Sequence, residues 1–182
     1  MRTWLVPLAV TAAALAPSLV SSTSPYAGQV AREIKALSHT DIADLLAGRG
    51  MGYAKAAELN GYPGPAHVLQ LADALELSAD QRLETRMIFE RMTSSAKAIG
   101  VQLVSAERAL DSAFRDRHVG RESLMLMVGE IAGYQSRLRN IHLQAHLEQT
   151  ALLTPRQISR YIALRGYRKG FVENTKPDHA HE

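Results

Sequence analysis

The chain has 182 residues, no cysteine, 21 Lys and Arg residues and 18 Asp and Glu residues. This near balance of charge argues against a nucleic-acid-binding protein and indicates no acidic tail. The lack of cysteine excludes disulfides and lipid attachment through a cysteine, so stability must come from packing. Few aromatic residues and many Ala, Leu, Arg, Glu and Gln residues favour one all-α domain.

Residues 1–22 are typical of an export signal. Arg2 precedes the apolar stretch Trp4–Ala16, and the small residues ending at Ser22 offer a cleavage site directly after Ser22. The stretch is shorter than the ~20 residues of a membrane-spanning helix, so cleavage is favoured over retention as an anchor. Losing Arg2 with the signal lowers the 21 basic residues to 20, against 18 acidic ones.

Residues 23–64 are the least regular part of the chain and predict an N-terminal arm. Ser38 can cap a short helix that Gly48 would end. A Gly-rich segment at 48–52 and a turn-rich segment at 60–65 follow. A Gly-rich loop can cradle phosphate, but this one lacks both a Lys-Ser/Thr ending and a preceding strand. We therefore expect an arm that wraps the helices rather than a phosphate site.

Residues 65–167 predict a helical domain followed by a polar tail at 168–182. The expected helices cover about 66–75, 78–117, 121–151 and 154–166. The two long helices, joined by a tight turn, are expected to pack antiparallel as a hairpin. Gly100 lies beside the apolar stripe of the first long helix and is expected to cost about 1 kcal/mol relative to Ala.

Each long helix carries one apolar stripe with residues three and four apart. The stripe of the first is Phe89, Met92, Ala96, Ile99, Leu103, Ala106, Leu110 and Ala113. The stripe of the second is Met127, Ile131, Tyr134, Leu138, Ile141 and Ala145. The opposite side of the second helix holds small and apolar residues, namely Met125, Gly129, Ala132, Gly133, Ser136, Leu143 and Leu147. We expect the arm or a second subunit to cover this side, a homodimer being favoured.

Two capping boxes open helices in this domain, one from Ser78 to Gln81 and one from Thr154 to Gln157. In each, the hydroxyl accepts a backbone N–H of the first turn and the Gln reaches back to the cap residue. Leu-Thr-x-x-Gln elements at helix starts in a small exported helical protein resemble the Spy/CpxP family of bacterial periplasmic proteins. The second element matches this pattern in full, and the first has Ser78 in place of Thr. The resemblance covers about residues 65–165.

This resemblance implies a periplasmic, ATP-independent chaperone or envelope-stress adaptor that binds non-native or envelope proteins on a concave helical surface. Basic residues would speed the encounter, and flexible apolar residues would tolerate many clients. The candidate surface residues are Arg82, Arg86, Met87, Arg91, Met125 and Leu147. Two alternatives stay open: these residues are ordinary surface or dimer-interface residues, or the protein is a scaffold for one partner, such as a sensor kinase or regulatory factor.

His142 and His146 stand four residues apart on one helix, within reach of one ion. A site needs three or four ligands, which His67, or His179 and His181 of the tail, could complete. The alternative is that the pair only makes hydrogen bonds at the edge of the core. Since the resemblance includes metal-sensing relatives, a sensor or buffer of Zn²⁺, Ni²⁺, Co²⁺ or Cu²⁺ is the second hypothesis. The first hypothesis requires no cofactor.

Catalytic motifs are missing from the sequence. It has no Cys nucleophile, no Gly-x-Ser-x-Gly elbow and no His-Glu-x-x-His pattern. The acidic residues around the Ser78 cap are explained by the helix dipole. We therefore expect that the protein is not an enzyme.

Overall fold

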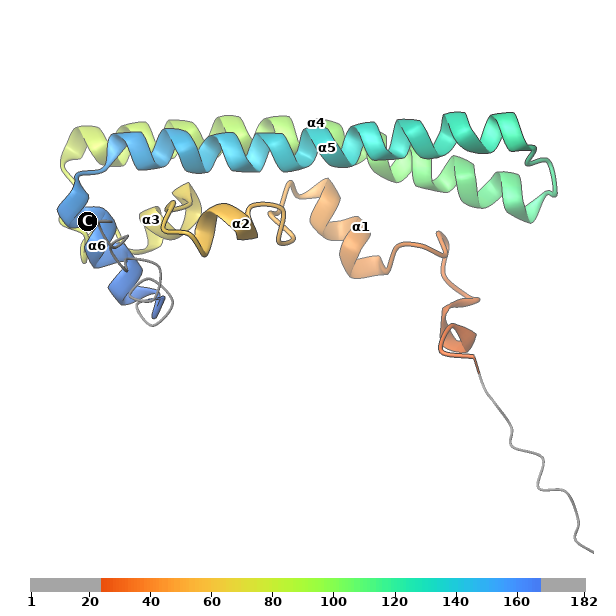
Figure 1. The fold of residues 1–182 in the computed structure, drawn as a ribbon, viewed down its shortest axis with the longest axis horizontal. Helices are drawn as coiled ribbons and strands as arrows, with labels where there is room; N and C mark the ends of the chain where they lie inside the picture. The colour runs from red at the N-terminus through yellow and green to blue at the C-terminus, as the bar shows by residue number, and fades with distance from the viewer. Residues whose placement is uncertain (1–23, 168–182) are drawn as a thin grey trace, which may run out of the picture. The chain divides into compact units, whose positions relative to one another are not determined.

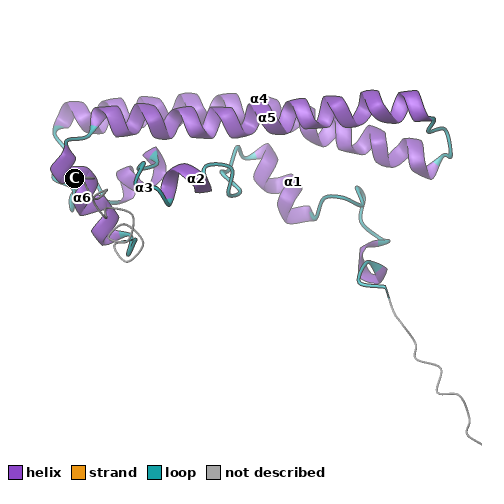
Figure 2. Ribbon diagram, in the orientation of Figure 1, coloured by secondary structure: helices purple, strands orange, loops and turns teal. Residues whose placement is uncertain are grey.

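The computed structural model describes residues 24–167, in which all regular elements are helical (Figure 2). The predicted export signal, its cleavage site after Ser22, and the tail with His179 and His181 lie outside these residues. No helix within 24–167 has both the length and the apolar character needed to span a membrane. The chain divides into two compact units, Met1–Val30 and Ala31–Glu182. In the first unit, the described residues form one short 3₁₀ helix, η1 (Ala27–Gln29).

The second unit is built on a long pair of helices, α4 (Ala79–Arg115) and α5 (Arg121–Leu152), which lie side by side (Figure 1). A short segment, 116–120, joins the end of one to the start of the other. A hydrogen bond between Thr85 of α4 and Gln149 of α5 links the start of the first helix to the end of the second. The ends predicted for these two helices differ from the observed ends by at most two residues.

The predicted stripe of α5 is confirmed at Ile131, Leu138 and Ala145, which are buried. The stripe predicted for α4 is right only in part, because a broader side of that helix is covered. Besides two stripe residues, Ala96 and Leu103, the buried residues of α4 are Thr85, Ile88, Gly100, Val104 and Glu107. The reason is that α4 packs against short helices of the preceding segment as well as against α5.

Three short helices of the preceding segment lie along one side of the α4–α5 pair (Figure 1). They are α1 (His39–Leu46), α2 (Lys55–Glu58) and α3 (Pro65–Gln70). Helix α1 contacts α4, α2 contacts α5, and α3 contacts both. Ser38 caps α1 through a complete capping box with Asp41, as predicted. Ile34 and Leu45 join Leu103 and Leu138 in one core, which attaches residues 34–45 to the helix pair.

Gly100 marks the closest approach of the arm to α4. A Cβ atom at this position would lie 2.1 Å from the carbonyl oxygen of Leu45, near the end of α1. The sequence predicted a mild propensity cost at Gly100. The structure shows instead that glycine is required at this position, because only a residue without a side chain lets the end of α1 reach the α4 backbone.

The short helix predicted over 66–75 ends earlier, at Gln70. The amide of Ala72 bonds the carbonyl of Leu69, three residues back, so the chain tightens out of the α-helix there. Irregular turns then bring Ala72 and Leu75 into a second core with Tyr161 of α6 (Pro155–Leu164). Tertiary packing against α6 thus replaces the last helical turn that the periodicity predicted.

Residues 31–64 of the arm do not cover the small and apolar side of α5, so the prediction that the arm covers it is wrong for this part of the arm. Met125 is 74% exposed and Leu147 is 55% exposed. In the described part of the chain, no atom lies within 4 Å of a Cβ built on Gly129 or Gly133. The arm packs elsewhere, on α4 and on the part of α5 that carries His142 and His146. The second-subunit alternative stays a prediction.

Candidate functional site

Both predicted capping boxes form, and they contact each other. The Ser78 hydroxyl accepts a hydrogen bond from the backbone N–H of Gln81 at 3.1 Å. The Thr154 hydroxyl accepts one from the backbone N–H of Gln157 at 3.3 Å. The two Gln side chains then hydrogen-bond reciprocally, at 3.0 and 2.9 Å. The boxes thereby join the start of α4 to the start of α6, a pairing that sequence reasoning missed.

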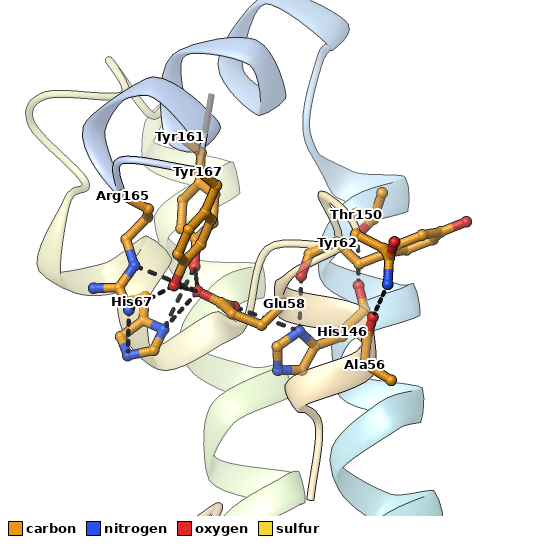
Figure 3. A network of polar contacts seen from close by, with 10 residues as sticks. Ala56, Glu58, Tyr62, His67, His146, Thr150, Tyr161, Arg165 and Tyr167 are labelled. Atoms are coloured by element: carbon orange, nitrogen blue, oxygen red, sulfur yellow. Dashed lines mark hydrogen bonds and ion pairs between the residues drawn. The ribbon is translucent and has the colours of Figure 1, made fainter. Parts of the chain in front are cut away.

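A buried carboxylate, Glu58 at the end of α2, holds the arm to the C-terminal part of the fold (Figure 3). Its Oε1 accepts from the hydroxyls of Tyr161, at 2.6 Å, and Tyr167, at 3.1 Å. The same oxygen lies 3.4 Å from Nε of Arg165 and 3.3 Å from Nδ1 of His67. Burial first, and then the hydrogen bond to Glu58, raise the pKa of the Tyr161 phenol, which therefore stays a donor.

His146 is held by the backbone of the turn-rich segment. Its Nδ1 lies 2.8 Å from the carbonyl oxygen of Tyr62, so this nitrogen carries the proton and donates. A Cβ at Gly64 would lie 2.7 Å from the His146 ring, so Gly64 allows the ring to approach the backbone. Oε2 of Glu58 is 3.8 Å from the same Nδ1, too far for a hydrogen bond.

His142 is 3% exposed and stacks on Tyr53, with ring centroids 6.0 Å apart and planes 6° apart. Burial, and secondarily the nearby His146, lower the pKa of His142, so the imidazole is neutral at pH 7. Its Nε2 is buried without a hydrogen-bond partner among residues 24–167. Burial is also the main reason that the pKa of His67 is lowered, although Glu58 acts in the opposite direction.

A cavity of about 620 Å³ lies between the arm and the helix pair. Its arm side is formed by Ala47, the Gly-rich segment 48–52, α2 and the start of α3. Phe89, Met92 and Thr93 of α4 face it, as do His142 and His146 of α5. The structure thus places the Gly-rich segment, which the sequence predicted as part of an arm that wraps the helices, at the wall of a cavity.

The three histidines predicted as metal ligands all line this cavity but do not form a ligand set. His67 contacts Glu58, His146 faces the Tyr62 carbonyl, and His142 stacks on Tyr53. Residues 24–167 contain no group of three or more His, Cys, Asp or Glu side chains that could hold a metal ion. No motif marked Glu58, which contacts two of the three histidines, because it lies in a four-residue helix within the arm.

The six residues predicted as a binding surface lie at two ends of the helix pair. Arg82, Arg86, Met87 and Arg91 lie in the first part of α4, and Leu147 lies near the end of α5, next to Glu148, which pairs with Arg91. Met125 is 22 positions before Leu147 on the same helix, which places it roughly 33 Å away along the axis. Met125 therefore lies at the other end of the helix pair from the remaining five predicted residues. The Arg82 guanidinium is less available to a client, because it donates a hydrogen bond to Asp73 at 2.8 Å.

Comparison of the chain with protein-family models, curated proteins and solved structures gives no match.

Proposed function

We propose that this protein is a periplasmic, ATP-independent chaperone or envelope-stress adaptor of the Spy/CpxP type. The observation that carries the proposal is the contact between the two Leu-Ser/Thr-x-x-Gln elements through Gln81 and Gln157. The motif occurs twice, and its two copies hydrogen-bond to each other, so they connect two helices as well as capping them. This connection supports the resemblance to the Spy/CpxP family. The cleaved signal and the periplasmic location belong to the same proposal.

Clients would bind the outer surface of the helix pair near the ends that the capping boxes join. Met87 is 48% exposed and Leu147 is 55% exposed there, and Arg86 and Arg91 lie close to Met87 along α4. Apolar contacts on an open helical surface are shallow and reversible, and Met adapts to clients of different shape. The arginines would attract acidic segments of non-native chains.

Light scattering of a chemically denatured client, diluted into buffer with the mature chain 23–182, tests this function. We expect suppression of aggregation without ATP, and weaker suppression by Met87→Glu and Leu147→Glu. Val101→Glu is the matched control, because Val101 is an apolar residue of α4 with similar exposure, 54%, outside the proposed surface. Equal losses in all three variants, or no suppression by the parent chain, would contradict the proposal.

For the fold, we propose an antiparallel hairpin that forms a homodimer through residues 125–136 of the small and apolar side of α5, which leaves Leu147 for clients. Gly129 and Gly133 have open space around them, and Met125 supplies apolar surface nearby. Small residues allow the close approach of a second helix. Sedimentation equilibrium should give a dimer for the parent chain and a monomer for Gly129→Arg. Gln135→Arg adds the same side chain at an exposed position of α5 outside this side, so it is the control and is expected to stay dimeric.

A metal sensor or buffer is the second candidate, favoured by one observation. Glu58 lies 3.3 Å from Nδ1 of His67 and 3.8 Å from Nδ1 of His146, so a carboxylate stands between two imidazoles. Binding Zn²⁺, Ni²⁺, Co²⁺ or Cu²⁺ there would require these side chains to rearrange, because their present partners are hydrogen-bonding groups. Calorimetric titration of untagged 23–182 and of His142→Ala/His146→Ala tests it. Micromolar binding that the double variant loses would support the metal function.

A further inference from the structure

We propose that the cavity between the arm and the helix pair binds an amphiphilic anion, a molecule with one apolar chain and a carboxylate or phosphate head group. The cavity has a volume of about 620 Å³, within the range of roughly 300–1,000 Å³ typical of small-molecule sites. This site is separate from the outer surface proposed for clients, and it adds a ligand to the proposed function.

Polar atoms of the wall are turned away from the cavity. Glu58 directs one carboxylate oxygen to the Tyr161 hydroxyl (Figure 3), and solvent does not reach its other oxygen. Nδ1 of His146 faces a backbone carbonyl. Oγ1 of Thr93 and Nε2 of His142 are also out of reach of solvent. Since an open cavity cannot present atoms that solvent does not reach, these polar atoms do not contribute to its surface.

The side chains that remain suit an apolar chain. Phe89 and Met92 of α4 and Met51 of the arm line the cavity, together with small residues such as Ala54 and Ala66. Methionine is unbranched and polarizable, so it adapts to a ligand of irregular shape. Removing an apolar chain from water into such a space is favourable.

The charges that solvent reaches on this wall are positive. Arg49 and Lys55 are exposed and line the cavity, so they lie where it opens to solvent. The acidic residue of the wall, Glu58, is buried and lies 3.4 Å from Nε of Arg165. Arg49 pairs with Asp44, whereas no carboxylate among residues 24–167 lies within 4 Å of the Lys55 ammonium group. A cation at the mouth is therefore free to receive an anionic head group.

Only an amphiphilic anion matches both parts of the cavity. A cationic amphiphile would place its head group beside Arg49 and Lys55, and like charges repel. A neutral amphiphile could fill the apolar part, but it would gain nothing from the cations at the mouth. A small inorganic anion would gain from the cations and leave the apolar part filled with water.

Calorimetric titration of the mature chain 23–182 with decanoate, decanol and decyltrimethylammonium tests the proposal, because the three share one chain and differ in head-group charge. Each is used below the concentration at which it forms micelles. We expect decanoate to bind about three- to tenfold more tightly than decanol, the range for a partly exposed ion pair, and the cation to bind most weakly. No binding of an anion, or tighter binding of decanol or of the cation, would overturn the proposal. Decyl phosphate is the second anionic probe, and the tighter of the two anions identifies the head group.

Two variants locate the binding. Lys55→Glu should weaken decanoate binding about three- to tenfold and strengthen binding of decyltrimethylammonium. Ala66→Phe should abolish binding of all the probes by filling the cavity. Arg121→Glu is the control, because it makes the same change of charge at an exposed position roughly 30 Å along α5 from His142, and it should leave all affinities unchanged. Unchanged decanoate affinity in Lys55→Glu, or in an Ala66→Phe variant with the helix content of the parent, would overturn the assignment.

Discussion

The side-chain amides of Gln81 and Gln157 form a closed pair in which each amide donates to the other and accepts from it. The second N–H of Gln81 donates to the carbonyl of Leu152, and that of Gln157 donates to the carbonyl of Leu75. Each Gln oxygen also accepts the backbone amide of its own cap residue. Every donor of both amides is therefore used, which makes the pair a specific connection between two helix starts.

Replacing either Gln by Ala should lower the free energy of unfolding by about 1–3 kcal/mol, because a part-buried carbonyl, that of Leu152 or that of Leu75 respectively, loses its donor. In a double-mutant cycle by urea unfolding, Gln81→Ala and Gln157→Ala should couple by about 1 kcal/mol. Gln144→Ala on the exposed surface of α5 is the control and should stay within about 0.5 kcal/mol of the parent. Strict additivity would show that the pair does not act as a unit.

Gly100→Ala should destabilise the protein even though alanine is the better helix former. The new Cβ would sit 2.1 Å from the Leu45 carbonyl oxygen, so α1 must move away from α4. We expect a loss of about 2 kcal/mol or more by thermal or urea unfolding, comparable to overpacking a core.

Gly133→Ala provides the contrast when it is made in the monomeric Gly129→Arg variant, because open space surrounds Gly133 within the described part of one chain. There the propensity difference alone should raise stability by about 1 kcal/mol. If both glycine variants changed stability in the same direction, the close contact at Gly100 would be wrong.

The fully buried pair Thr85 and Gln149 should be replaceable by apolar residues without loss. Gln149 donates to Thr85 at 3.1 Å, but its own oxygen is buried with no partner among the described residues. Gln149→Met alone leaves the Thr85 hydroxyl unsatisfied and should cost about 1–2 kcal/mol. Adding Thr85→Val should recover most of that loss, measured by urea unfolding. A double variant less stable than the single one would show that the hydrogen bond itself carries the stability.

Stability should fall as the pH is lowered through the range in which unfolded histidine titrates, near pH 6.5. Burial lowers the pKa of His142 and of His67 in the folded state, so below about pH 6.5 the unfolded chain binds more protons. Proton binding then favours unfolding, and the free energy of unfolding drops as pH falls. Thermal midpoints measured from pH 7.5 to 5.5 should decrease, and His142→Phe should make the decrease smaller. His118→Phe, at an exposed position, should leave the slope unchanged.

The helix starts and the apolar stripe of α5 could be predicted from the sequence because they depend on residues close in the chain. A cap at Ser38, Ser78 or Thr154 needs a partner only three residues away. Stripe spacing follows from the helix period, which is why Ile131 and Leu138 were found. The end of α3 and the full buried side of α4 were not predictable in this way, because they depend on what packs against those helices.

The candidate site needed the tertiary structure for the same physical reason. Three of its histidines could be found from spacing and residue type, but their partners could not. Glu58 bonds Tyr161 from 103 positions away, and Gln81 bonds Gln157 from 76 positions away. Gly100 is required by a carbonyl of Leu45 on another helix. Local sequence therefore determined where the capped helices α1, α4 and α6 begin and which residues line the apolar stripe of α5. Only the packing of the arm onto the helix pair decided which polar groups meet, which remain unsatisfied, and where a cavity is left between them.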